Sequence, residues 1–338
     1  MNRHFDFIIA GQGLAGSLLA WFLLKRNKKV LVIDDDFPSS SSRVAAGIIH
    51  PITGRRLVKT WNADVLIPFA SDCYLQIEKE SASRFFFVTP ILEIFTSTHH
   101  RNEWMTRSME EDVKNYAGKI FHPDELPPEI NAPLGGILIN NTGWLDVKAF
   151  LNALKSFIVH NGVFINEKVS EDDLFLEKNN VRWRDVTASK IILCDGYSAL
   201  TKKYFNHLPF LPAKGELVIF RSNELSDQFI LNQKIFILPL GENLFKAGST
   251  FQWNDLSSRV TEEAKQFLTK EISKMIRCDF EIINQQAAIR PTTKDRRPFT
   301  GIHPELNQLG IFNGLGTKGV IMAPYFAKRF GDYLCKDE

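Results

Sequence analysis

A glycine-rich turn between two short apolar runs constrains the fold of this chain more than any other feature of its sequence. The run Phe5–Ala10 is followed at once by Gly11-Gln12-Gly13-Leu14-Ala15-Gly16. Residues 14–27 then read as a helix, and a second apolar run, 30–34, ends in an acid. Runs of this length predict strands buried on both faces of a parallel sheet. The first 34 residues are therefore expected to form one strand–helix–strand unit.

Each glycine of this turn has its own physical role. Gly11 permits the tight turn, Gly13 lets the backbone approach a pyrophosphate, and Gly16 lets the helix pack closely on the strand. The helix N-terminus adds open N–H groups and positive potential. Asp34, 18 residues after Gly16, can accept hydrogen bonds from ribose hydroxyls and would repel the 2′-phosphate of NADP. The unit therefore favours FAD or NAD.

A second glycine-rich turn lies near the other end of the sequence. Gly314-Leu315-Gly316-Thr317-Lys318-Gly319 leads into an apolar-periodic helix predicted over 320–330. A helix N-terminus suits a developing negative charge, and a reduced flavin carries such a charge near its N1 atom and C2 carbonyl. This turn is a candidate for binding the reactive end of a flavin whose pyrophosphate lies on the first turn.

Composition argues against several classes of protein. Lys and Arg number 41 against 39 Asp and Glu, an excess of +2 that is too small for a general nucleic-acid-binding surface. The four cysteines are widely spaced without a Cys-x-x-Cys pair, so we expect a reducing, cytoplasmic compartment. His99 and His100 are adjacent and lack partners at ligand spacing, so no metal site is expected. Glycines and polar residues interrupt the apolar stretch 5–24, so no membrane span is expected either.

The remaining pattern indicates two interleaved lobes. Further helices are predicted over 61–80, 146–161 and 261–276, and further strands near 85–95, 135–140, 163–165, 191–194, 216–221, 234–238, 244–250 and 311. Since no long linker separates autonomous modules, we predict an α/β fold with a discontinuous dinucleotide-binding domain and a β-rich, α+β second lobe. The first comprises residues 1–80, 141–208 and 287–338, and the second, a substrate domain, residues 81–140 and 209–286.

Three further motifs accompany the two turns in a fixed order. They are Ser42-Arg43-Val44-Ala45-Ala46-Gly47-Ile48, Lys214-Gly215-Glu216, and the stretch 290–301, of the form Arg-Pro-x-Thr-x-Asp-x-x-Pro-x-x-Gly. With them, nearly the entire chain resembles FAD-dependent amino acid oxidases of the glycine oxidase, D-amino acid oxidase and sarcosine oxidase group. In that group the first motif lies beside the flavin and the second lies in the substrate lobe.

The resemblance implies a D-amino acid oxidase-like fold with a Rossmann-like FAD-binding domain. It also implies oxidation of the C–N bond of a small amino acid or amine such as glycine, sarcosine or a D-amino acid. The α-carbon would give a hydride to flavin N5, water would hydrolyse the imine, and O₂ would reoxidise the flavin. Residues 285–301 contain no cysteine, where the sarcosine oxidase branch attaches its flavin, so FAD is expected to be non-covalent.

Site residues follow from the same resemblance. Arg290 would grip the substrate carboxylate through two parallel N–H bonds, and Lys246 would lie near the flavin and stabilise superoxide during oxygen reduction. The predicted FAD-binding residues are Gly11, Gly13, Leu14, Ala15, Gly16, Asp34, Ser42, Arg43, Ala45, Ala46, Gly47, Val169, Gly196, Gly314, Gly316, Thr317, Lys318, Gly319 and Val320.

Two departures keep the substrate open. Phe236 stands where glycine and D-amino acid oxidases tend to have a tyrosine, and Thr317 stands where the glycine oxidase turn has an arginine. One alternative is oxidation of a carboxymethylaminomethyl group in tRNA, against which the balanced charge argues. The other is a non-catalytic flavin-binding module without a substrate cavity. No motif specifies an oligomeric state.

Overall fold

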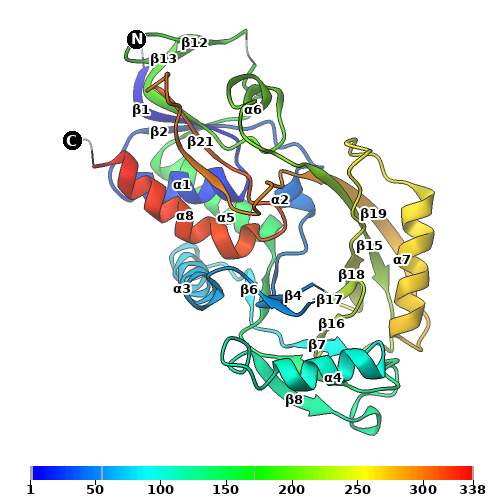
Figure 1. Ribbon diagram of the computed structural model, residues 1–338. Coiled ribbons are helices and arrows are strands. Elements are labelled where there is room, and N and C mark those ends of the chain that lie inside the picture. Colours follow the sequence, from blue (N-terminus) through cyan, green and yellow to red (C-terminus); the bar gives the residue numbers. More distant parts are fainter. Residues whose placement is uncertain (1–2, 55, 171, 337–338) are drawn as a thin grey trace.

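Two eight-stranded sheets organise the chain into two lobes (Figure 1). The computed structural model describes residues 3–54, 56–170 and 172–336. The domain boundaries given above remain our proposal.

The first sheet brings the ends of its parallel strands to one edge. Its order is β11 (Val163–Ile165), β2 (Val30–Ile33), β1 (Arg3–Ala10), β14 (Val186–Leu193), β13 (Val181–Trp183) and β12 (Leu174–Leu176), with β21 (Leu309–Asn313) also pairing with β14 and β20 (Phe299–Ile302) pairing with β21. Strands β11, β2, β1, β14 and β21 are parallel. Ligands of open α/β sheets bind outside the carboxyl ends of such strands. Gly11, Asp34, Cys194 and Gly314 each follow one of these ends.

Helices α1 (Leu14–Leu24), α5 (Val147–Asn161) and α8 (Gly319–Leu334) cover this sheet, with α1 packed against both of the others (Figure 1). Every residue of α1 is buried, as are the four residues of β2. The apolar stretch 5–24 is therefore a core strand, a turn and a core helix, as predicted. Over the ranges that the structure describes, no helix combines the length and apolarity needed to cross a membrane.

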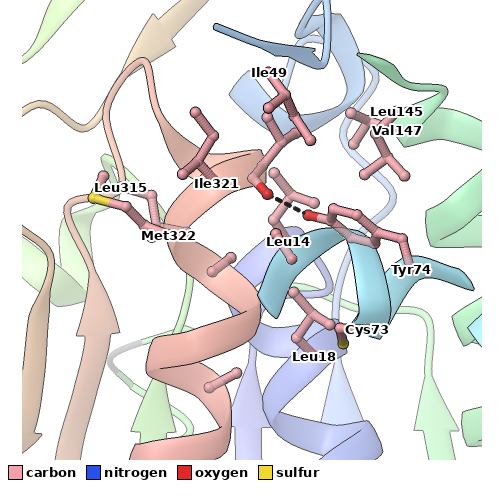
Figure 2. Packing of buried hydrophobic residues seen from close by; sticks show 14 of the residues in the cluster. Leu14, Leu18, Ile49, Cys73, Tyr74, Leu145, Val147, Leu315, Ile321 and Met322 are labelled. Atoms are coloured by element: carbon pink, nitrogen blue, oxygen red, sulfur yellow. Dashed lines mark hydrogen bonds between the residues drawn. The ribbon is translucent and has the colours of Figure 1, made fainter. Parts of the chain in front are cut away.

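Helix α3 (Ala63–Ser81) packs on α8 and supplies a hydrogen-bond donor to a backbone carbonyl of α8 (Figure 2). Pro324 lies inside α8 and has no N–H, so the carbonyl of Val320, four residues earlier, loses its usual helical donor. The buried Tyr74 hydroxyl donates to that carbonyl at 2.7 Å. Burial raises the pKa of Tyr74 well above its usual value, which keeps this donor protonated.

The second sheet forms the other lobe. Its order is β19 (Glu281–Arg290), β15 (Ala213–Arg221), β18 (Leu244–Gly248), β17 (Phe236–Gly241), β16 (Ile230–Asn232), β7 (Ile91–Ile94), β9 (Gly136–Ile139) and β8 (Ala117–Phe121). Helix α7 (Glu262–Met275) covers its outer face, on the side away from the first sheet (Figure 1). Leu268 and Ile272 of α7 pack in one core cluster with Val218 and Phe220 of β15. The inner face is left to line the site.

The remaining elements are short and lie outside the two large sheets. They are α2 (Ser41–Val44), β3 (Ile48–Ile49), β4 (Ile52–Thr53), β5 (Val58–Lys59), β6 (Phe86–Phe87), α4 (Thr98–Arg107), η1 (Pro123–Glu125), β10 (Gly143–Leu145) and α6 (Ala199–Tyr204). The strand predicted near 85–95 is in fact two, because β6 pairs with β10 whereas β7 pairs with β9 and β16. Pro90 lies between them, lacks an N–H and restricts the residue before it, which ends the continuous ladder. The helix predicted to reach residue 27 ends at Leu24, and Asn27 adopts a positive φ of 59°.

Candidate active site

A cavity of about 1470 Å³ lies between the two sheets. Its walls come from residues that follow β1, β2, β14 and β21, and from β15, β16, β17 and β19 of the second sheet. This volume exceeds the usual range for one drug-sized ligand, so the cavity has room for a dinucleotide and a small substrate. The predicted site residues in its lining are Gly11, Gly13, Leu14, Ala15, Asp34, Ser42, Arg43, Ala45, Ala46, Gly47, Val169, Gly196, Arg290, Gly314, Gly316, Thr317, Lys318, Gly319 and Val320.

Close backbone approach explains the glycines of the first turn. Gly11 has φ of +106°, and a Cβ there would come within 2.6 Å of the Cys194 carbonyl oxygen. A Cβ on Gly16 would lie 1.9 Å from the Gly11 oxygen, so Gly16 packs beneath the turn and does not line the cavity. Gly13 caps α1 without a side-chain hydrogen bond, and the Leu14 N–H donates to Ser42 Oγ at 3.2 Å. Gly13, Leu14 and Ala15 line the cavity, so the N-terminus of α1 faces it.

Asp34 holds the position of a ribose acceptor. Its Oδ2 accepts the Gln12 N–H at 2.7 Å and its Oδ1 accepts the Asp36 N–H at 2.8 Å. Burial raises the pKa of Asp34. The two hydrogen bonds and the charge of Arg43 lower this pKa and so offset part of the effect. The carboxylate is thereby fixed at the end of β2, in the cavity lining beside the first turn.

The second turn places a cation at the N-terminus of α8. Asn313 holds the turn against the first sheet, because its Nδ2 donates to the Gly196 oxygen at 2.8 Å and its Oδ1 accepts the Gly314 N–H at 2.8 Å. Lys318 Nζ donates to the His50 carbonyl oxygen at 3.1 Å. Burial, together with the charge of Arg296, lowers the pKa of Lys318 to about 8. Positive potential therefore gathers at this end of the cavity.

Arg290 is a cavity cation without a carboxylate partner among the described residues. Its Nη2 donates to Ser249 Oγ at 2.7 Å, and the Phe251 ring lies 5.3 Å from its guanidinium carbon. The guanidinium lies over Gly215, where a Cβ would come within 1.9 Å of Nη2, so a side chain at this position of the Lys-Gly-Glu motif would displace Arg290. Burial lowers the pKa of Arg290 to about 10. Such a group suits a carboxylate ligand.

Lys246 lies outside the cavity lining. Its Nζ donates to the carbonyl oxygen of Ala45, which does line the cavity, at 3.3 Å. Burial lowers the pKa of Lys246, against the charge of Asp146. Its role in oxygen reduction stays a prediction.

Two buried polar atoms in the wall were missed by sequence reasoning. His50 Nδ1 and Thr292 Oγ1 have no hydrogen-bond partner in the part of the chain that the structure describes, and both residues line the cavity. Burial lowers the pKa of His50 to about 3, so its imidazole is neutral. Buried polar atoms without partners are costly, which indicates that a bound ligand completes this wall. The two helix N-termini, Asp34 and these open atoms together fit FAD.

Comparison with known families agrees with this geometry. The model of the DAO family, described as FAD dependent oxidoreductase, matches residues 6–333. Glycine oxidase of Bacillus subtilis strain 168 is 21% identical and aligns with 100% of this chain and 95% of its own. A tRNA 5-methylaminomethyl-2-thiouridine biosynthesis bifunctional protein of Leptospira interrogans is 24% identical over 93% of this chain, which spans only 55% of that protein.

The fold also matches a solved structure. The crystal structure of glycine oxidase from Bacillus cereus superposes with a TM-score of 0.84 at 18% identity, covering 99% of this chain and 96% of the other. This likeness confirms the predicted D-amino acid oxidase-like fold class.

Proposed function

Because the chain belongs to the DAO family of FAD-dependent oxidoreductases, we propose that it oxidises the C–N bond of a small amino acid or amine that carries a carboxylate. The observation that carries this proposal is Arg290, a cavity cation that no described carboxylate neutralises. It shares one cavity with both glycine-rich turns. The glycine oxidases among the relatives support a substrate of this size.

The residues of the chain bind the substrate, orient its α-carbon and stabilise negative charge on the cofactor. Arg290, which donates a hydrogen bond to Ser249, binds the carboxylate and so fixes the orientation of the substrate's α-carbon. Leu217 and Phe236 supply an apolar wall that limits water. When bound, FAD would supply the two-electron oxidation of the substrate C–N bond, and water would hydrolyse the resulting imine. The N-terminus of α8 and Lys318 would stabilise negative charge on the cofactor at this end of the cavity.

The cofactor-binding residues divide along the cavity in this proposal. Gly11, Gly13 and Asp34 hold the adenosine and pyrophosphate, whereas the turn 314–319 and the loop 43–50 hold the flavin ring. We propose that FAD is bound non-covalently and that O₂ is the electron acceptor.

The test is the visible spectrum of the purified protein, followed anaerobically as glycine, sarcosine, D-alanine and D-proline are added. Flavin bands that bleach with one of these amines are expected, and readmitted air should restore them if O₂ is the acceptor. A FAD-loaded protein whose bands never bleach with any carboxylated amine would contradict the proposal.

Oxidation of a tRNA modification is the second candidate, favoured by the Leptospira relative. The chain's excess of only +2 opposes it, since tRNA binding relies on clustered positive charge. Adding tRNA that carries the carboxymethylaminomethyl group to the same cuvette separates the two. Bleaching by this tRNA alone would favour the second candidate over the first.

A further inference from the structure

The side-chain amide of Asn232 lies in the cavity wall, on a different strand of the second sheet from Arg290. It ends β16, where it pairs with Phe236 of β17 on one side and with Glu93 of β7 on the other. Asn232 and Phe236 both line the cavity. Asn232 and Arg290 are the two residues with polar side chains that strands of the second sheet contribute to this lining.

Glu93 fixes which end of the Asn232 amide is free. Asn232 Nδ2 donates to Glu93 Oε2 at 2.5 Å, and Glu93 is only 6% exposed. The other carboxyl oxygen, Oε1, lies 3.8 Å from His100 Nε2. Burial raises the pKa of Glu93 to about 8, and Oε2 of this carboxyl accepts the hydrogen bond from the amide nitrogen. The amide oxygen is thereby left as an acceptor, and no described residue donates a hydrogen bond to Asn232 Oδ1.

The strand order sets the separation between Asn232 and the carboxylate anchor. Arg290 donates to Ser249, which follows Gly248, and Gly248 pairs with Phe236. Phe236 in turn pairs with Asn232. Cross-strand neighbours lie about 5 Å apart, so two such steps place Asn232 about 10 Å from Gly248, with the Phe236 position between. A ligand with its carboxylate on Arg290 reaches Asn232 only if it carries a chain of several bonds.

We propose that Asn232 is a specificity-determining residue whose amide oxygen accepts a hydrogen bond from an N–H or O–H group on the substrate side chain. Glu93 acts through it as a positioning residue. The inference rests on the proposed function, because it takes Arg290 as the carboxylate anchor. The hydrogen bond to Asn232 favours amino acids that have an amide or hydroxyl at the end of a short side chain over glycine or sarcosine. Sites built to hydrogen-bond a substrate group discriminate strongly against analogues that lack it.

Calorimetry on the FAD-loaded protein tests this with carboxylates that cannot be oxidised. The probes are succinamate, glutaramate and adipamate, each paired with the alkanoate in which an isopropyl group replaces the amide. At least one amide should bind about tenfold more tightly than its partner, as expected for one hydrogen bond. Asn232→Leu should abolish that preference, whereas Gln233→Leu, which alters the next residue outside the cavity lining, should retain it.

Variants of Glu93 test its positioning role. Glu93→Gln keeps an acceptor for the Asn232 amide and should retain the amide preference, whereas Glu93→Leu should lose it while acetate still binds. Equal binding within every wild-type pair, or a preference that survives Asn232→Leu, overturns the inference and leaves the proposed function standing. Because the probes lack an amino group, failure of every amine to bleach the flavin counts against the proposed function alone.

Discussion

At the scale of single residues, Arg290 is the side chain on which substrate recognition depends. We predict that Arg290→Met lowers kcat/KM for carboxylated amines about a hundredfold or more, since the buried substrate carboxylate loses its partner. Esters of the same amines should lose far less, because they carry no carboxylate. Arg297→Met is the matched control, as Arg297 lies over the Trp61 ring and outside the cavity lining. Equal losses for acids and esters would refute the assigned role.

The site residues that the sequence predicted are those whose constraint is local. Gly11 and Gly314 have positive φ, and a Cβ on either would come within 2.6 Å of a neighbouring atom. Both positions therefore require glycine, and a short sequence motif reveals them. No comparable local requirement distinguishes His50, Thr292 and Asn232 in the sequence. Their role depends on which side chains from distant segments leave an atom without a partner, and single-sequence patterns do not contain that information.

At the scale of elements, the contact of α3 with α8 compensates for a proline. We predict that Tyr74→Phe costs about 1–3 kcal/mol of unfolding free energy, because the Val320 carbonyl is left without a donor. In a Pro324→Ala background the restored N–H should satisfy that carbonyl, so the same substitution should cost much less. Urea denaturation of the four proteins measures this coupling. Additive effects of the two substitutions would show that the proline and the tyrosine act independently.

Elements with a strong period or a compact apolar run were predicted, whereas the division of one run into two strands and a helix without an apolar face were not. Helix α5 has one buried face and its N-cap Asp146 accepts the Ala149 N–H, both of which are readable in sequence. The division of residues 85–95 into β6 and β7 depends on which partner each strand finds. Helix α4 buries only Trp104 among its residues, so it lacks the apolar stripe that would have indicated it.

At the scale of the whole molecule, FAD should join the two lobes, because residues of both sheets line its cavity. We predict that FAD slows amide hydrogen exchange at residues 11–16 and 314–319 and also at 215–217 and 287–290 of the second sheet. ADP, which lacks the flavin ring, should protect the first segment and leave the second sheet unchanged. Protection by FAD confined to the neighbourhood of residues 11–16 would contradict a cavity shared by both lobes.

The order of the two glycine-rich turns along the chain bears on how the protein is made. The first turn leaves the ribosome early, but the turn 314–319 emerges only after every strand of the second sheet has been synthesised. A nascent chain therefore carries the adenosine-binding turn and the loop 43–50, but it lacks the turn that completes the binding site of the flavin ring. Capture of the flavin becomes a late event in biosynthesis, and a chain whose translation stops short stays without its redox centre.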